Sequence, residues 1–411
     1  TRRSRRRQIG ASASVGRSAT RNPCIASTCA TNTGVAARSR PSGLTNSRNE
    51  FLITTIPVTP TSTSRNSTIL IPHFADGGAW KTQVILVNPT DASIGGTIRF
   101  LDNGTPAVEA AIISDTPYRI EPRSSFRLIT AGTSARTTSG SVRILPVAGQ
   151  AMPSTMTLFS YSRSGITVSE AGVAGAAPAS AFRIYAEISG NFDASEVGSI
   201  QTGFAITNAS TTSNASVTLE LMNVGATVLR TATVTVPVSG QIGMFLNQIP
   251  EFRDIPLPFY GVLRVRSTVA GGIAVTGLRG RYNERNDFLF ASTPPITEGS
   301  APNAEMIFPH IADGGGYTTQ FILMSNPGGQ SSAGSLAFYD AGGTQTAVAL
   351  RSVVPPKPIV KVLSAGTLIS KPGNLFDLEG KTLRWTPSPA TYSVQVLPLA
   401  FDEATGTALS N

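Results

Sequence analysis

The chain has 411 residues, which is enough for two to four domains that each bury a core. Only 14% of the residues are charged, whereas Gly, Ser, Thr, Ala and Val abound, and this composition favours short strands joined by turns over helices. The formal net charge of +9 would suggest a polyanionic partner only if it covered a folded face. Ten arginines lie in the first 49 residues, and the rest of the chain has 23 basic and 24 acidic residues, so we expect no nucleic-acid partner.

Residues 1–45 are rich in Arg, Ser, Thr and Ala and lack Lys, Asp, Glu and Phe, so they are predicted to form a disordered or irregular basic tail. Three explanations stay open: a basic arm for an anionic surface, a truncated or wrongly framed gene start, and a segment leading into an exchanged strand. The unusual composition favours the second. The start TRRSRRRQIG is similar to a twin-arginine signal, but no apolar stretch follows, so the sequence does not identify an export route.

Cys24 and Cys29, the two cysteines of the chain, also lie in this tail. Without further Cys or His nearby they do not supply the four ligands of a structural zinc site, so we interpret them as incidental thiols. No stretch of 18 apolar residues occurs, and the sequence therefore predicts no membrane span.

A long internal repeat comes next along the chain. A shift of 237 positions superimposes IPHFADGGAWKTQVIL, from Ile71, on FPHIADGGGYTTQFIL, from Phe308, without a gap. The same shift superimposes NSRNEFL, from Asn46, on NERNDFL, from Asn283. Residues 46–58 are therefore predicted to be the orphan last strand of a preceding module. Such a strand could complete the sheet of another copy by strand addition.

The repeated unit divides again into two similar halves. Segments that begin at Gln83, Gly203 and Gln320 resemble one another, and each is followed by a strand that starts GSVRIL, GVLRVR or GKTLRW. The sequence therefore predicts three modules, at residues 67–175, 181–293 and 304–411. Small-residue and proline-rich segments at 171–181 and 292–305 are expected to join them.

Within a module the apolar runs are short and β-branched, as in TQVILV, GTIRFL, SFRLIT and SVRILPV, with turn signals such as NPTD and DNGT between them. Seven or eight such strands in little more than a hundred residues are typical of an immunoglobulin-like β-sandwich. The predicted fold class is all-β, with three tandem immunoglobulin-like β-sandwich modules preceded by the irregular basic tail.

The repeated loop contains both histidines of the chain, His73 and His310, each three residues ahead of an aspartate, Asp76 or Asp313. A tetrahedral zinc site needs three or four ligands, and this loop offers two at most. We therefore predict a structural turn and no metal site. Pro72 is expected to end a strand, and Gly77 and Gly78 to adopt the positive φ angles of a tight turn.

In this interpretation Asp76 bonds backbone amides two residues further on, and an aromatic residue, Trp80 or Tyr317, covers the sandwich edge. If the loops bind a ligand or make contacts, the candidate residues are His73, Asp76, Trp80, His310, Asp313 and Tyr317. The charged stretch GLRGRYNERNDFLF, residues 277–290, is expected to form a contact between modules because a partial copy of it starts at Asn46.

Motifs of catalysis are missing from the sequence: it has no G-x-S-x-G elbow, no H-E-x-x-H and no phosphate-binding glycine loop. We predict no catalytic residue, no cofactor and no enzyme activity.

The strings IPHFADGGAWKTQVILVNPTD, GSIQTGFAITN, MFLNQIP and LRGRYNERNDFLFASTPP resemble a repeat of predicted secreted, multi-repeat bacterial proteins, over roughly residues 46–411. The resemblance implies extracellular or cell-surface β-sandwich modules and implies no reaction.

The expected function is a noncatalytic structural rod, stalk or filament at the cell surface that associates end to end or through neighbouring modules. An adhesin or carbohydrate-binding module that uses Trp80 and Tyr317 on surface polysaccharide is the alternative, and a region accessory to an enzyme is the third hypothesis.

Overall fold

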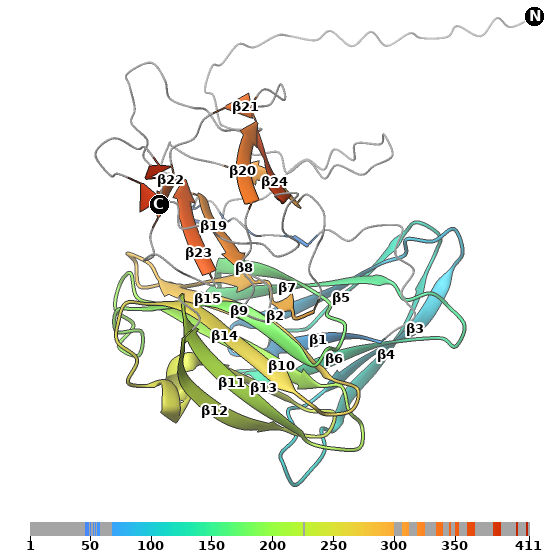
Figure 1. The fold of residues 1–411 in the computed structure, drawn as a ribbon. Coiled ribbons are helices and arrows are strands. Elements are labelled where there is room, and N and C mark those ends of the chain that lie inside the picture. Colours follow the sequence, from blue (N-terminus) through green and yellow to red (C-terminus); the bar gives the residue numbers. More distant parts are fainter. Residues whose placement is uncertain are drawn as a thin grey trace, which may run out of the picture. The chain divides into compact units, whose positions relative to one another are not determined.

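The structure, a computed structural model, describes parts of residues 46–57, residues 68–299 apart from 225 and 226, and only strands beyond residue 305 (Figure 1). The predictions for the tail at 1–45 and for its two cysteines lie outside these residues. The described residues hold antiparallel sheets, two single-turn 3-10 helices and no α-helix. The predicted all-β class is therefore confirmed.

The first eight strands form a sandwich of two four-stranded sheets. They are β1 (Ile69–Asp76), β2 (Trp80–Val87), β3 (Ile94–Leu101), β4 (Ile112–Ile120), β5 (Ser125–Ile129), β6 (Thr138–Pro146), β7 (Ser154–Arg163) and β8 (Ile166–Ala174). One sheet has the order β1-β6-β3-β4 and the other the order β5-β2-β7-β8.

Alternation of side chains explains how these strands bury a core. In β2, Thr82, Val84 and Leu86 are buried, whereas the residues between them keep part of their surface. Phe74, Ile98 and Ile144 from the other sheet meet this face in one apolar cluster. Burial of such a side chain contributes about 1.5–3 kcal/mol to folding, so the cluster holds the two sheets together.

The next nine strands repeat the arrangement. They are β9 (Ala181–Ser189), β10 (Ile200–Asn208), β11 (Ala215–Asn223), β12 (Val228–Val236), β13 (Gln241–Phe245), β14 (Phe259–Ser267), β15 (Ile273–Tyr282), β16 (Phe288–Thr293) and β17 (Ile296–Thr297). The 3-10 helices η1 (Leu246–Gln248) and η2 (Pro250–Phe252) lie between β13 and β14. The order β12-β11-β14-β9 matches β4-β3-β6-β1, and β13, β10, β15 and β16 pair as β5, β2, β7 and β8 do.

The two sheets of this second sandwich are continuous, because Ile188 and Ser189 of β9 pair with β10. β17 also pairs with β9. β17 lies within residues 292–305, which the sequence predicts to be a segment that joins two modules. Likewise, residues 171–174 of the expected first linker lie in β8. We refer below to residues 69–174 and 181–297 as the first and second sandwich.

The predicted β-sandwich is confirmed, and its strand order is distinctive. In immunoglobulin constant domains the first strand pairs with the second, and the seventh with the sixth. Here β1 pairs with β6, and β7 pairs with β2. The first and seventh strands have thus exchanged sheets relative to that order.

The strands described beyond residue 305 keep part of the same order. They are β18 (Met306–Ile311), β19 (Thr319–Met324), β20 (Gly334–Tyr339), β21 (Gln345–Thr346), β22 (Leu350–Ser352), β23 (Val360–Ala365), β24 (Lys381–Pro387), β25 (Ala400–Phe401) and β26 (Ala408–Leu409). β24 lies between β18 and β20, as β6 lies between β1 and β3. Ile322 and Met324 of β19 pack against Tyr185 and Met222 of the second sandwich.

The segment that corresponds to NERNDFL of the second sandwich, at residues 46–52, is not a strand in its described part. Residues 47 and 48 form a turn, and Asn46 Nδ2 donates to Thr167 O of β8 at 3.1 Å. The module boundaries inferred from the sequence, and the interpretation of residues 46–58 as an orphan strand, stay predictions.

Candidate functional site

A β-bulge carries the first histidine. Ile71 faces Val142, whereas Phe74 faces Gly140, so Pro72 and His73 together oppose one residue of β6. The prediction that Pro72 ends the strand is wrong, because β1 continues to Asp76. A bulge leaves one residue out of the ladder, which is why a proline without an amide hydrogen is tolerated inside this strand.

The same irregularity recurs where the sequence recurs. In β18, Phe308 faces Leu383 and Ile311 faces Lys381, so Pro309 and His310 form the corresponding bulge. Asp313 and Tyr317 lie outside the described residues, as do the side-chain surroundings of His310.

The predicted turn follows β1. Gly77, Gly78 and Ala79 have φ angles of +79°, +58° and +79°, and Gly77 and Trp80 exchange two backbone hydrogen bonds. Positive φ at both central residues is the mark of a type I′ turn, so the tight glycine turn is confirmed. Asp76 does not bond amides two residues further on; its Oδ1 accepts a hydrogen bond of 2.6 Å from Gly132 N, in the loop between β5 and β6.

His73 makes contacts away from Asp76. Its Nδ1 lies 3.3 Å from Nε2 of Gln241 in β13, and its ring centroid lies 5.9 Å from that of Phe159. The ring keeps some surface because it faces a cavity, yet the surrounding protein lowers the pKa of His73 to about 4 by desolvation. His73 is therefore neutral at neutral pH, and it joins the first sandwich to the second.

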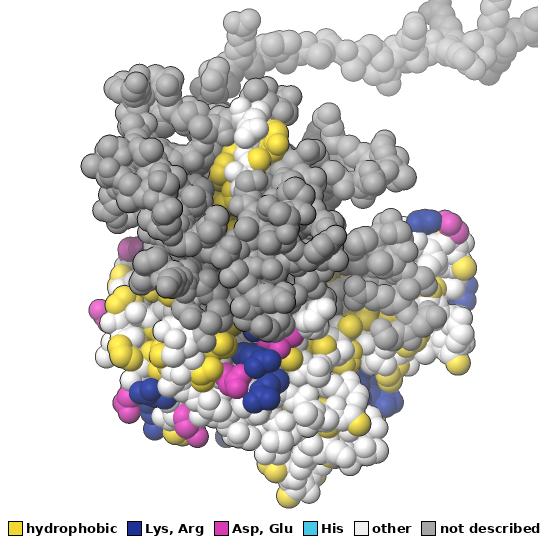
Figure 2. Space-filling view, viewed as in Figure 1, with side chains coloured by type: hydrophobic (Ala, Val, Ile, Leu, Met, Phe, Trp, Pro, Cys, Tyr) yellow, Lys and Arg dark blue, Asp and Glu magenta, His cyan; other side chains and the backbone are white. Residues whose placement is uncertain are grey.

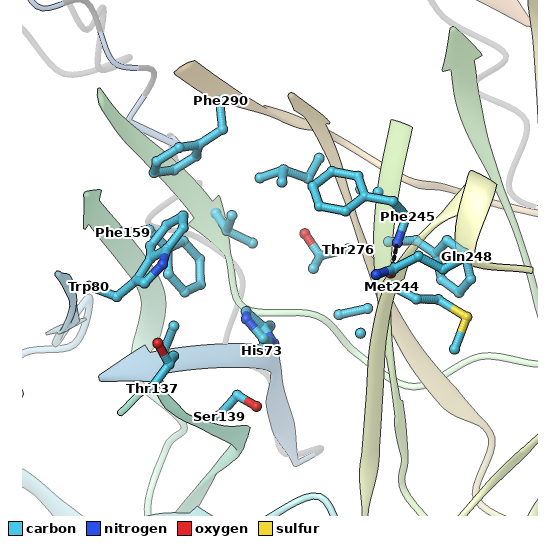
Figure 3. A pocket seen from close by; sticks show the side chains of 18 of the residues that line it. His73, Trp80, Thr137, Ser139, Phe159, Met244, Phe245, Gln248, Thr276 and Phe290 are labelled. Atoms are coloured by element: carbon cyan, nitrogen blue, oxygen red, sulfur yellow. Dashed lines mark hydrogen bonds between the residues drawn. The ribbon is translucent and has the colours of Figure 1, made fainter. Parts of the chain in front are cut away.

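The cavity beside His73 has a volume of about 360 Å³ and is lined by both sandwiches. Figure 3 shows Trp80, Phe159 and Phe290 on one side of it and Met244 and Phe245 on the other. Among the described lining residues, none is Asp, Glu, Lys or Arg. The cavity is therefore apolar and aromatic, with His73 as its one titratable side chain.

Aromatic side chains form a continuous wall along this contact. The ring of Trp80 lies 4.8 Å from Tyr161 and 5.0 Å from Phe290, measured between centroids. Phe288 connects this group to Phe192 and Phe245, at 6.1 and 6.3 Å. Trp80 thus packs against the second sandwich through Phe290 as well as against Tyr161 of its own sandwich.

A buried aspartate lies at one margin of the same contact. The side chain of Asp287 is 2% exposed, and its two oxygens accept hydrogen bonds from Arg163 at 3.0 Å and Arg48 at 2.9 Å. Burial acts to raise the pKa of Asp287, but the two arginines outweigh it and hold the pKa below its usual value. Arg163 belongs to β7, so the charged stretch 277–290 does connect modules, as predicted.

The two copies of the NxRN motif meet each other here. Arg48 binds Asp287, and Arg285 Nε reciprocally lies 3.0 Å from Glu50. Each copy folds into the same turn: the amides of Arg48 and Glu50 donate to Asn46 Oδ1, as those of Arg285 and Asp287 donate to Asn283 Oδ1. The residues at equivalent positions therefore pair crosswise, as in an isologous interface.

Further hydrogen bonds join the first two sandwiches directly. Arg143 Nη2 donates to Asn208 O at 2.9 Å, and Thr207 Oγ1 donates to Pro72 O at 3.2 Å. At the backbone, Ala110 N donates to Val238 O at 3.0 Å. These bonds reach from strand interiors and loops alike, so the contact is specific over its length.

Two buried asparagines, Asn88 and Asn208, were not singled out from the sequence. Asn88 Nδ2 donates to the carbonyls of Ala92, Ile120 and Glu121, and Asn208 Nδ2 makes the equivalent three contacts in the second sandwich. The signal was present as an Asn at the same place in VNPTD and TNAST. Their role is to tie the loop after β2 or β10 to the end of β4 or β12, across the sandwich.

On the visible face of Figure 2, basic and acidic side chains lie next to one another. Arg99 and Asp115 form a partly exposed ion pair, with 2.7 Å between Nη2 and Oδ2. In the described part of the chain, no group of three or more His, Cys, Asp or Glu residues is placed to hold a metal ion. That same part contains no helix with the length and apolar character needed to cross a bilayer.

Comparison with known proteins gives no match, either to a protein-family model or to a curated protein.

Proposed function

We propose that the chain is a noncatalytic structural repeat protein of the cell surface or the extracellular space, and that its sandwiches are held in a fixed order by contacts built into each module. The observation that carries the proposal is the crosswise pairing of the two NxRN motifs around the buried Asp287. A motif that pairs with its own copy requires no partner of a different sequence.

The resemblance of the sequence to secreted repeat proteins supports the location, and the aromatic surface buried in the contact supports permanence. Trp80, Phe288 and Phe290 bury aromatic surface between the sandwiches, as stable interfaces do. End-to-end association of chains into filaments is part of the same proposal, through exchange: residues 46–52 of a second chain would replace the chain's own copy and offer the same pairs.

The test is assembly of the purified full chain, followed by sedimentation velocity and electron microscopy. We expect ordered oligomers or filaments, and we expect Asp287→Asn to shift them towards smaller species because it removes the charge that Arg48 and Arg163 bind. Asp115→Asn is the matched control, since its pair with Arg99 lies within the first sandwich and leaves the charges around Asp287 unchanged. Monomers at every concentration, with no ordered particles in micrographs, would sink the proposal.

The alternative of a carbohydrate-binding module has less support at Trp80. Binding sites for surface polysaccharide present an aromatic face to solvent, whereas the indole of Trp80 packs on Tyr161 and Phe290 and lines the cavity between the sandwiches. Tyr317 lies outside the described residues, so its part in this alternative stays a prediction.

A further inference from the structure

The cavity between the first two sandwiches lies beside a group of small residues on one face of the second sandwich. Phe204 and Ile206 of β10 point into the core, so Gly203 and Ala205 lie on the opposite face, towards the first sandwich. Ala205 pairs with Gly243 of β13 on one side and with Thr276 of β15 on the other. Three adjacent strands thus contribute a row of small residues.

Such a row of small residues lowers the stability of the strands that contain it. Glycine weakens a strand because it fixes a flexible backbone and offers no side chain for packing, and it often marks a close approach of a ligand or another chain. Protein interiors otherwise fill to a density near that of organic crystals. Two sandwiches that only needed to adhere would be better served by leucine or valine at Ala205, whereas a side chain added at Gly243 would meet Gln241 and His73.

We propose that this cavity binds a small uncharged aromatic compound of one or two rings. Its volume of about 360 Å³ lies at the lower end of the range for ligand sites, and a cavity of about 150 Å³ already accepts benzene. The rings of Trp80, Phe159 and Phe245 surround the space (Figure 3) and offer edge and face contacts to a flat ligand.

The charge and polarity of the cavity lining restrict the class of ligand further. A charged ligand would lose its hydration without meeting a countercharge, because His73 is neutral and the described lining holds no ionic side chain. A sugar would bury several hydroxyls, but the polar side chains labelled at the cavity are few: His73, Thr137, Ser139, Gln248 and Thr276. One polar substituent on the ligand finds a partner among them.

The experiment uses the full chain with Trp385→Phe, which leaves Trp80 as its one tryptophan. Benzyl alcohol and benzoate form a matched pair of probes, since they share the ring and differ in charge, and glucose tests the sugar alternative. We expect benzyl alcohol to change the Trp80 emission in a saturable way, with a dissociation constant of about 1 mM or lower. Benzoate and glucose are expected to produce no saturable change.

Filling variants separate a binding site from a packing imperfection. Ala205→Leu and Thr276→Ile, on neighbouring strands, each place extra carbons in the space and are expected to weaken benzyl alcohol binding at least tenfold. Either variant suffices if the other does not fold. The proposal is overturned if benzyl alcohol gives no saturable signal, if benzoate or glucose binds as well, or if both folded variants bind it unchanged. Assembly of the chain is measured separately, so failure here leaves the proposed function intact.

Discussion

The bulge at Pro72 and His73 brings one histidine to the contact between two sandwiches. A regular strand would alternate His73 with its neighbours, and the extra residue re-aims it towards Gln241 and the cavity. The repeat of Pro and His in β18 reflects the repeat of this bulge.

The titration of His73 predicts an acid-sensitive contact. The pKa of His73 is about 4 in the folded chain, whereas its ordinary value is 6.5. Between these pH values His73 is therefore protonated in the unfolded chain but neutral in the folded chain. The stability that neutral His73 preserves is complete above pH 6.5 and declines as the pH falls towards 4, by at most about 3 kcal/mol. Urea unfolding at a series of pH values measures this decline.

His73→Gln is the comparison for this prediction, because glutamine is neutral throughout the range. The variant is expected to lose the decline between pH 6.5 and 5, whatever its absolute stability. Asp287 does not contribute to this decline, since its pKa is held below its usual value. An identical pH dependence in both proteins would show that His73 is not the group responsible.

At the scale of the strand, a recurring glycine is explained by a bulge in the neighbouring strand. Gly140 of β6 and Gly261 of β14 occupy equivalent places, and each lies against a carbonyl, of Leu101 or of Met222, where the register of β3 or β11 shifts. A methyl group on either glycine would overlap that carbonyl oxygen. The glycine that begins GSVRIL and GVLRVR is therefore a requirement of backbone packing.

Alanine at either glycine is expected to destabilise its sandwich by about 2–3 kcal/mol, because the neighbour that must move is backbone. Gly203→Ala is the contrast: the nearest atoms to its added methyl belong to the ring of Phe245, at 3.0 Å, which can rotate away. Chemical denaturation of Gly140→Ala, Gly261→Ala and Gly203→Ala compares the three. Equal costs in all three would mean that the bulge carbonyl is not the cause.

For the molecule as a whole, the contact between the first two sandwiches couples their stability. Arg143 is 8% exposed, and its guanidinium donates to the carbonyls of Asn208 and Ala209 across the contact. A hydrogen bond from a charged donor contributes about 1.5–3 kcal/mol, so the two sandwiches unfold together as long as such bonds hold.

We therefore expect one calorimetric transition for the two sandwiches, and expect Arg143→Met to broaden it or divide it into two. Arg99→Met is the control, because Arg99 faces Arg143 across β3 and β6 but pairs with the exposed Asp115. Two separate transitions already in the unaltered chain would contradict the coupling.

The strands and the turns were predictable because their signals are local. The β-branched runs predicted β2, β3 and β6, and the glycines at 77 and 78 predicted the tight turn, which is of type I′. The bulge at Pro72 was not predictable in this way, since proline by itself indicates the end of a strand as readily as a bulge within it.

The candidate site was predicted only in part. His73 and Trp80 were singled out from the repeat, but their partners Gln241 and Phe290 lie more than 160 residues further along the chain. The charged stretch near Asp287 was correctly placed at a contact, because a copy of it occurs at Asn46.

The sequence by itself determined the all-β class, the repeated units and the positions of tight turns, since these depend on neighbouring residues and on self-similarity. Only the tertiary structure decided that Gly203, Ala205 and Gly243 line a cavity, that Asp287 is buried among arginines, and that β1 pairs with β6. The physical reason is distance along the chain: each of these features arises where two segments without any local signal for one another come into contact.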